Sequence, residues 1–100
     1  MTVFAVEYTY DPARTDDLAA VRPAHREFLQ GLVDAGSLLA SGPWLDNAAP
    51  VALLLVLAQD VDGAQQLLDD DPFLKAHLIS QRTVRPWNPV MGAFAEHASQ

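Results

Sequence analysis

The run Val51-Ala52-Leu53-Leu54-Leu55-Val56-Leu57-Ala58 is the longest apolar stretch in this chain of 100 residues. It is far shorter than the ~20 residues that a membrane-spanning helix needs. Apolar residues at successive positions are typical of a strand that is covered on both faces. We therefore expect residues 51–58 to form a central strand of a sheet.

Three further segments have the features of strands. They cover residues 2–10, 38–44 and 79–87. In the first, aromatic and β-branched residues alternate between two faces, up to the Asp11-Pro12 turn. In the second, Gly42-Pro43 indicates a bulge or an edge position. These segments and the apolar run predict a four-stranded sheet, with a linker over residues 46–50.

A long helix is expected between the first two strands, because apolar residues recur at helical spacing from Leu18 to Val33. Gly36 suits the position that follows a helix. Pro23 lacks an N–H group and does not fit deep inside a regular helix. Either the regular helix begins near Arg22 with Pro23 in its first turn, or the helix bends at this point.

A second helix is expected after the apolar run. Asp60 or Asp62 would cap its start, and the cluster Asp69-Asp70-Asp71 with Pro72 would end it. The resulting order, β-α-β-β-α-β, is typical of the ferredoxin-like α+β fold with an antiparallel sheet. In that topology the first and third strands are central, and they are the most apolar strands of this sequence.

Two helices cover only one face of such a sheet, so a second copy of the sheet is the simplest cover for the other face. We expect residues 1–100 to form a single domain that pairs into a dimeric α/β barrel. Residues 88–100 would be a C-terminal tail that packs on the domain or on the dimer partner. Within it, Val90, Met91 and Phe94 are expected to be buried.

The composition excludes several classes of function. The formal charge is −7, from 13 acidic and 6 basic residues, and the basic residues are scattered. This argues against nucleic-acid and anionic-membrane partners. The absence of cysteine excludes disulfides and thiolate catalysis. The start, Met1-Thr2-Val3-Phe4, does not resemble a signal peptide, so a cytoplasmic location is expected.

A histidine and an aspartate are the candidate catalytic residues. His25 lies in the apolar stripe of the long helix, where an unpartnered polar group is costly. Asp71 precedes Pro72 in a turn from which it is free to reach across to His25. Such a pair is the minimal acid/base site, since the carboxylate orients the imidazole. A hydrogen-bonded structural histidine and an ordinary Asp-Pro turn are the alternative interpretations.

Further residues are candidates for binding a substrate. They are Tyr8, Arg22, Ser41, Gly42, Pro43, Phe73 and Trp87. Their alternative roles are packing, strand geometry and ion pairing. Because His77 and His97 have no partners at metal-site spacing, no metal is expected. Phosphate loops and dinucleotide fingerprints are missing, so no cofactor is expected.

Four segments in register resemble the YCII-related (YciI-like) family. They are residues 21–25 (VRPAH), 36–43 (GSLLASGP), 70–73 (DDPF) and 84–87 (VRPW). The resemblance implies a dimeric α+β barrel with a cleft centred on His25 and Asp71. Some relatives are similar to muconolactone isomerases and chloromuconolactone dehalogenases, which move a proton next to a lactone carbonyl. The chain departs from many members at Arg26-Glu27, which follows the histidine.

These observations predict a cofactor-independent enzyme of the lyase or isomerase kind. His25 would act as general base and then acid on a small organic acid or lactone, and Asp71 would orient it. Two alternatives remain open at this point. One is a non-enzymatic dimeric barrel that binds a small ligand, and the other is a haem-linked or cofactor-free monooxygenase.

Overall fold

A computed structural model describes residues 1–46 and 50–99, so residues 47–49 of the predicted linker lie outside the described residues. One antiparallel sheet has the strand order β2-β3-β1-β4. Its strands are β1 (Thr2–Tyr10), β2 (Leu38–Pro43), β3 (Val51–Ala58) and β4 (Ile79–Trp87). The predicted ferredoxin-like α+β fold is confirmed, with β1 and β3 at the centre of the sheet.

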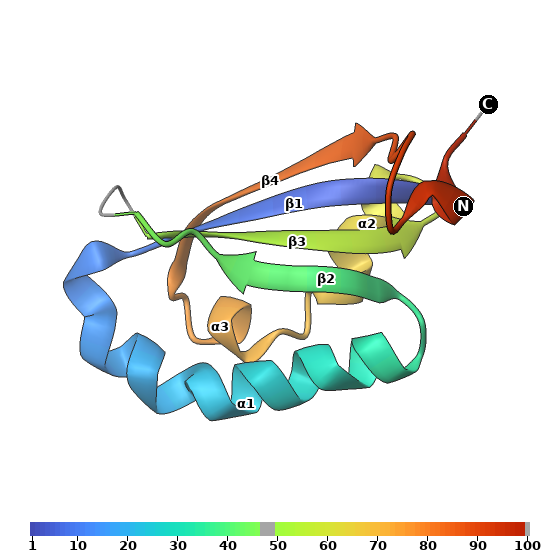
Figure 1. Ribbon diagram of the computed structural model, residues 1–100. Coiled ribbons are helices and arrows are strands. Elements are labelled where there is room, and N and C mark those ends of the chain that lie inside the picture. Colours follow the sequence, from blue (N-terminus) through green and yellow to red (C-terminus); the bar gives the residue numbers. More distant parts are fainter. Residues whose placement is uncertain (47–49, 100) are drawn as a thin grey trace.

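The helices lie on one side of the sheet (Figure 1). They are α1 (Thr15–Asp34), α2 (Val61–Leu68) and α3 (Pro72–Lys75). Two short 3-10 helices are present as well, η1 (Pro12–Arg14) before α1 and η2 (Ala95–His97) in the C-terminal tail. Alternate β1 residues from Phe4 to Tyr10 are buried beneath them, together with Leu54 and Val56 of β3. The core is therefore the layer between the helices and one face of the sheet.

The long helix begins earlier than the first alternative predicted. It starts at Thr15, not near Arg22, and runs through Pro23. Leu18 in this early part is buried, which anchors it despite the backbone hydrogen bond lost at proline. Figure 1 shows that the first turns and the rest of α1 run in different directions, as the second alternative predicts. The bend keeps both parts of the helix against the domain.

Gly36 ends α1 as predicted. Its φ of +80° is in the region that favours glycine. The N–H groups of Gly36 and Ser37 donate to the carbonyls of Val33 and Leu32, the pattern of a Schellman motif. This turn directs the chain straight into β2.

The edge position of β2 is confirmed, although its irregularity lies between Leu38 and Ala40 and not at Gly42-Pro43. Asp60 caps α2 by accepting from the Gly63 N–H at 2.7 Å. The sequence pattern did not predict α3, because one helical turn is too short to show a periodic pattern.

In the single chain, the apolar side chains of the tail are covered to different extents. Val90 and Met91 are 64% and 88% exposed, whereas Phe94 is partly buried. The tail is closed on itself by hydrogen bonds between Asn88 and Ser99, which leave both apolar side chains outside. None of the helices in residues 1–46 and 50–99 is long and apolar enough to cross a bilayer.

Candidate active site

His25 of α1 and Asp71, which precedes α3, lie in hydrogen-bonding contact. The Nδ1 atom of His25 is 2.8 Å from Oδ1 and 3.0 Å from Oδ2 of Asp71. Asp71 is fully buried, and His25 is 8% exposed. An ionised carboxylate only accepts hydrogen bonds, so we assign the proton to Nδ1. Nε2 is then the nitrogen with a free lone pair.

The sequence Asp71-Pro72-Phe73 fixes the carboxylate in place. Pro72 occupies the first position of α3, where its missing N–H costs nothing. The Phe73 N–H donates to Oδ1 of Asp71 at 2.9 Å, so the aspartate caps the helix that follows it. The carboxylate thus has a fixed orientation toward His25.

Tyr8 of β1 supplies a further donor to the same carboxylate. Its hydroxyl donates to Oδ2 of Asp71 at 3.1 Å, and its side chain is fully buried. Burial raises the pKa of the Tyr8 phenol well above its ordinary value, and the charge and hydrogen bond of Asp71 raise it further. Tyr8 therefore stays a neutral donor that helps to hold Asp71.

Two aromatic rings complete the surroundings of the imidazole. Phe73 stacks on His25 with ring centroids 3.9 Å apart and an interplanar angle of 11°. Tyr10 meets the Phe73 ring edge to face at 5.5 Å. Asp71 and Phe73 together restrict the imidazole ring to one orientation.

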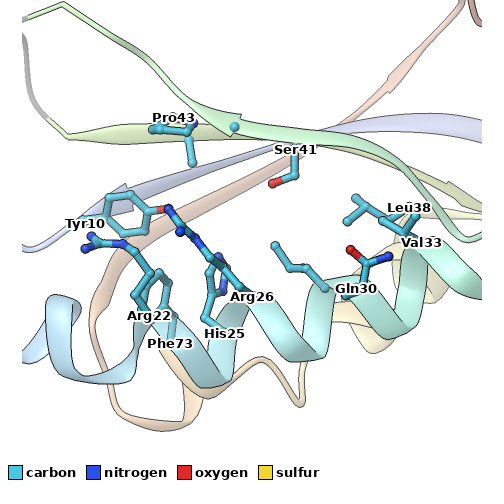
Figure 2. Close-up of a pocket in the computed structure, with 13 residues that line it drawn as sticks. Tyr10, Arg22, His25, Arg26, Gln30, Val33, Leu38, Ser41, Pro43 and Phe73 are labelled. Carbon is cyan, nitrogen blue, oxygen red and sulfur yellow. The ribbon is translucent and has the colours of Figure 1, made fainter.

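His25 faces a cavity of about 560 Å³ between α1 and the sheet (Figure 2). A volume of this size suits a small organic molecule. The cavity is lined by Tyr10, Arg22, His25, Arg26, Leu29, Gln30, Val33, Leu38, Ser41, Gly42, Pro43, Ala52 and Phe73. A ligand in it has access to the imidazole of His25, whereas Asp71 is not part of the cavity lining.

Most of the residues predicted from sequence are brought together here. Those that line the cavity are His25, Arg22, Ser41, Gly42, Pro43 and Phe73. Asp71 and Tyr8 lie behind His25, so Tyr8 contacts the carboxylate and is not part of the cavity wall.

Trp87 does not lie at this cavity. It pairs with Val3, whose side chain points to the opposite side of the sheet from the neighbouring Phe4. Trp87 is consequently on the face without helices, where it is 44% exposed. The Val-Arg-Pro-Trp motif gave no indication of which face the tryptophan would take.

Three polar residues of the cavity were missed by the sequence analysis, namely Tyr10, Arg26 and Gln30. Arg22, Arg26 and Gln30 follow one another at intervals of four residues and so share one face of α1. This spacing was visible in the sequence. Tyr10 is the last residue of β1, and the alternation of the strand alone does not indicate that this end borders the cavity.

Tyr10 is the second phenol with a displaced titration. Burial, followed by the charge of Asp71, raises the pKa of Tyr10 to about 12, while the charge of Arg22 acts in the opposite direction. The chain has no tyrosine besides Tyr8 and Tyr10. The absorbance of tyrosinate therefore reports on these two residues alone.

We predict that the folded protein forms little tyrosinate at pH ~10, where half of an ordinary tyrosine is ionised. Because the folded state keeps these protons and the unfolded state releases them, the free energy of unfolding should be undiminished below pH ~10 and should fall above it. Ultraviolet absorbance and circular dichroism along one alkaline titration provide the test. Tyrosinate should appear together with loss of structure.

Protein unfolded in urea is the control and should titrate near pH ~10. If folded protein ionised half of its tyrosine at this pH, the burial of both phenols would be contradicted.

Among residues 1–46 and 50–99, no group of three or more His, Asp or Glu side chains is arranged to hold a metal ion.

Comparisons with known proteins agree with this fold. The model of the YCII-related domain family matches residues 2–88. Protein YciI of Escherichia coli O6:H1 (strain CFT073) is 32% identical over 94 residues, which cover 85% of this chain and 96% of the relative. Protein YciI of Shigella flexneri gives the same values.

Two solved structures show the same fold. The 5-chloro-2-hydroxyhydroquinone dehydrochlorinase of Burkholderia phenoliruptrix AC1100, in complex with 2,5-dihydroxybenzoquinone, superposes with a TM-score of 0.75 and 22% identity. The match covers 86% of this chain and 93% of the dehydrochlorinase. An antibiotic biosynthesis monooxygenase superposes with a TM-score of 0.55 and 16% identity, covering 88% and 97% of the two chains.

Proposed function

The chain belongs to the YCII-related domain family, and from this premise we propose that it is a cofactor-independent enzyme that moves protons on a small organic acid or lactone. The observation that carries the proposal is the buried His25–Asp71 pair, whose imidazole faces a cavity. Its reaction would be of the lyase or isomerase kind.

In the proposed mechanism, Nε2 of His25 removes a proton from a carbon next to a carbonyl group and later returns it. Asp71 holds the ring in the required tautomer and stabilises the imidazolium while it carries the proton. The hydroxyl of Ser41, on the opposite wall of the cavity (Figure 2), is available to donate a hydrogen bond to the carbonyl oxygen. Such a bond would stabilise the charge that develops there.

The test is the exchange of carbon-bound hydrogen in D₂O, followed by proton NMR. Small lactones and organic acids that have hydrogen on the carbon next to a carbonyl form the panel, and 2,5-dihydroxybenzoquinone is added because the dehydrochlorinase of the same fold is in complex with it. At least one lactone or acid that binds should lose its acidic C–H signal faster with protein than in buffer. Binding in the cavity without any exchange would instead identify a ligand-binding module.

We further propose that two chains pair through the sheet face without helices. Leu53 and Leu57 of β3 are partly exposed there, and a groove of about 260 Å³ runs past Trp44, Leu53 and Leu55. A second sheet would cover these apolar groups. The exposed Val90 and Met91 of the tail would then pack on the partner.

We predict that Leu53→Asp converts the protein to a folded monomer, because the introduced charge cannot be desolvated in such an interface. Light scattering during gel filtration should give about twice the mass of one 10.9 kDa chain for the unaltered protein. For the variant it should give the mass of one chain. Val61→Asp, at an exposed site on α2, is the control and should remain dimeric. A monomeric unaltered protein would contradict the proposal.

A further inference from the structure

The cavity is lined by two arginines in a chain that has an excess of acidic residues. Arg14, Lys75 and Arg82 each form an ion pair with an aspartate. Within residues 1–46 and 50–99, Arg22 and Arg26 form no hydrogen bond or ion pair, although the formal charge of the chain is −7. Their guanidinium groups are thus available to a ligand.

The two arginines lie on either side of His25 in the sequence of α1. Arg22 and Arg26 are four residues apart, which places them about 6 Å apart along the helix axis. In Figure 2 both guanidinium groups lie toward Tyr10, on one side of the imidazole. Arg22 lies near Tyr10, so its positive charge lowers the pKa of the Tyr10 phenol. Burial raises the same pKa by a larger amount.

This end of the cavity is rich in hydrogen-bond donors. A guanidinium has no acceptor atom, and the phenol of Tyr10 is protonated at neutral pH and has an O–H to donate. Gln30 and Ser41 lie on the other side of the imidazole in Figure 2. Their amide and hydroxyl groups both donate and accept, so they suit a neutral part of a ligand.

We infer that Arg22, Arg26 and Tyr10 form a subsite for a carboxylate, which holds an organic acid with its neutral, reactive part against His25. The inference rests on the proposed function and narrows its substrate from acids or lactones to acids. A planar carboxylate fits the fork of a guanidinium. Two guanidinium groups and a phenol hydroxyl together supply donors for both carboxylate oxygens of the ligand. The subsite thereby orients the ligand along the cavity.

Matched pairs of acids and amides test the inference without any turnover. The probes are benzoate and benzamide, 2-hydroxybenzoate and 2-hydroxybenzamide, and crotonate and crotonamide. Dissociation constants are measured from the backbone amide shifts of ¹⁵N-labelled protein. At least one acid should bind about tenfold more tightly than its amide, with shifts centred on residues 22–26, because hydrogen bonds to a charged group are the stronger ones.

The double variant Arg22→Gln/Arg26→Gln should bring that preference down to about twofold or less, since glutamine keeps polarity but not charge. Arg85→Gln is the matched control. Arg85 also lacks a partner among the described residues, but it pairs with Ala5 on the helix-free face of the sheet. The Arg85→Gln variant should bind the acid in preference to the amide as strongly as the unaltered protein does.

The inference is overturned if no acid in the panel binds more tightly than its amide, or if the double variant keeps the preference. Failure of the proposed function would look different. In that case His25→Ala would leave proton exchange unchanged, while the acid would still be preferred and the preference would still depend on Arg22 and Arg26.

Discussion

Replacing His25 by alanine is expected to slow the protein-catalysed exchange of carbon-bound hydrogen about 10²–10⁴-fold, the contribution that a positioned acid/base group makes to a rate. The structure gives the physical reason. The Nδ1 atom is occupied by Asp71 at 2.8 Å, so Nε2 is the ring nitrogen left to act as a base, and His25 lines the cavity. Alanine removes this atom without changing the arginines that line the same cavity.

His25→Asn separates loss of the base from loss of structure. The asparagine amide still donates to Asp71, so the buried carboxylate keeps a partner. It has no nitrogen that takes up a proton near neutral pH. We expect the same loss of exchange as in His25→Ala, with a smaller loss of stability.

His97→Ala is the control for the general effect of removing a histidine. His97 lies in η2 near the C-terminus and does not line the cavity. The His97→Ala variant should catalyse exchange at the rate of the unaltered protein. Exchange in His25→Asn at the unaltered rate would contradict the assignment of His25 as the base.

Asp71→Ala should cause a large loss of stability, about 3–5 kcal/mol, because each buried donor left without an acceptor costs about 1–3 kcal/mol. The carboxylate accepts from His25, from the Tyr8 hydroxyl and from the Phe73 N–H. Alanine leaves these donors buried without an acceptor. Since single domains have a total stability of about 5–15 kcal/mol, the change is a large share of the whole.

Urea unfolding at one fixed protein concentration measures this loss, because pairing of chains would add a concentration dependence. Asp70→Ala is the matched control. Asp70 is the preceding residue, and its side chain is 79% exposed with a 3.5 Å contact to Lys75. Its removal should change the free energy of unfolding by about 0.5 kcal/mol or less. Equal losses in the two variants would show that the buried network stabilises nothing.

The strands were predictable from sequence because burial imposes a pattern on them. The run 51–58 is apolar throughout and became β3, a central strand, while Phe4, Tyr8 and Tyr10 share the core face of β1. The meeting of His25 and Asp71 was also predicted. A polar residue in an apolar stripe required a partner, and the Asp-Pro turn offered one.

Other features depend on tertiary structure and have no local pattern. The course of α1 through Pro23 depends on packing of Leu18, which compensates for a lost hydrogen bond. The face taken by Trp87 depends on the register between β4 and β1. Tyr8 reads as an aromatic residue of a strand, and only the fold places its hydroxyl on Asp71.

The tautomer of the His25 ring is the most direct test of the account, because it requires no substrate. Nitrogen NMR of ¹⁵N-labelled protein distinguishes the two ring nitrogens of neutral histidine. We predict that Nδ1 of His25 carries the hydrogen, that Nε2 is free to accept a proton, and that Asp71→Asn abolishes this preference. A hydrogen on Nε2 in the unaltered protein would mean that Nε2 is not the base.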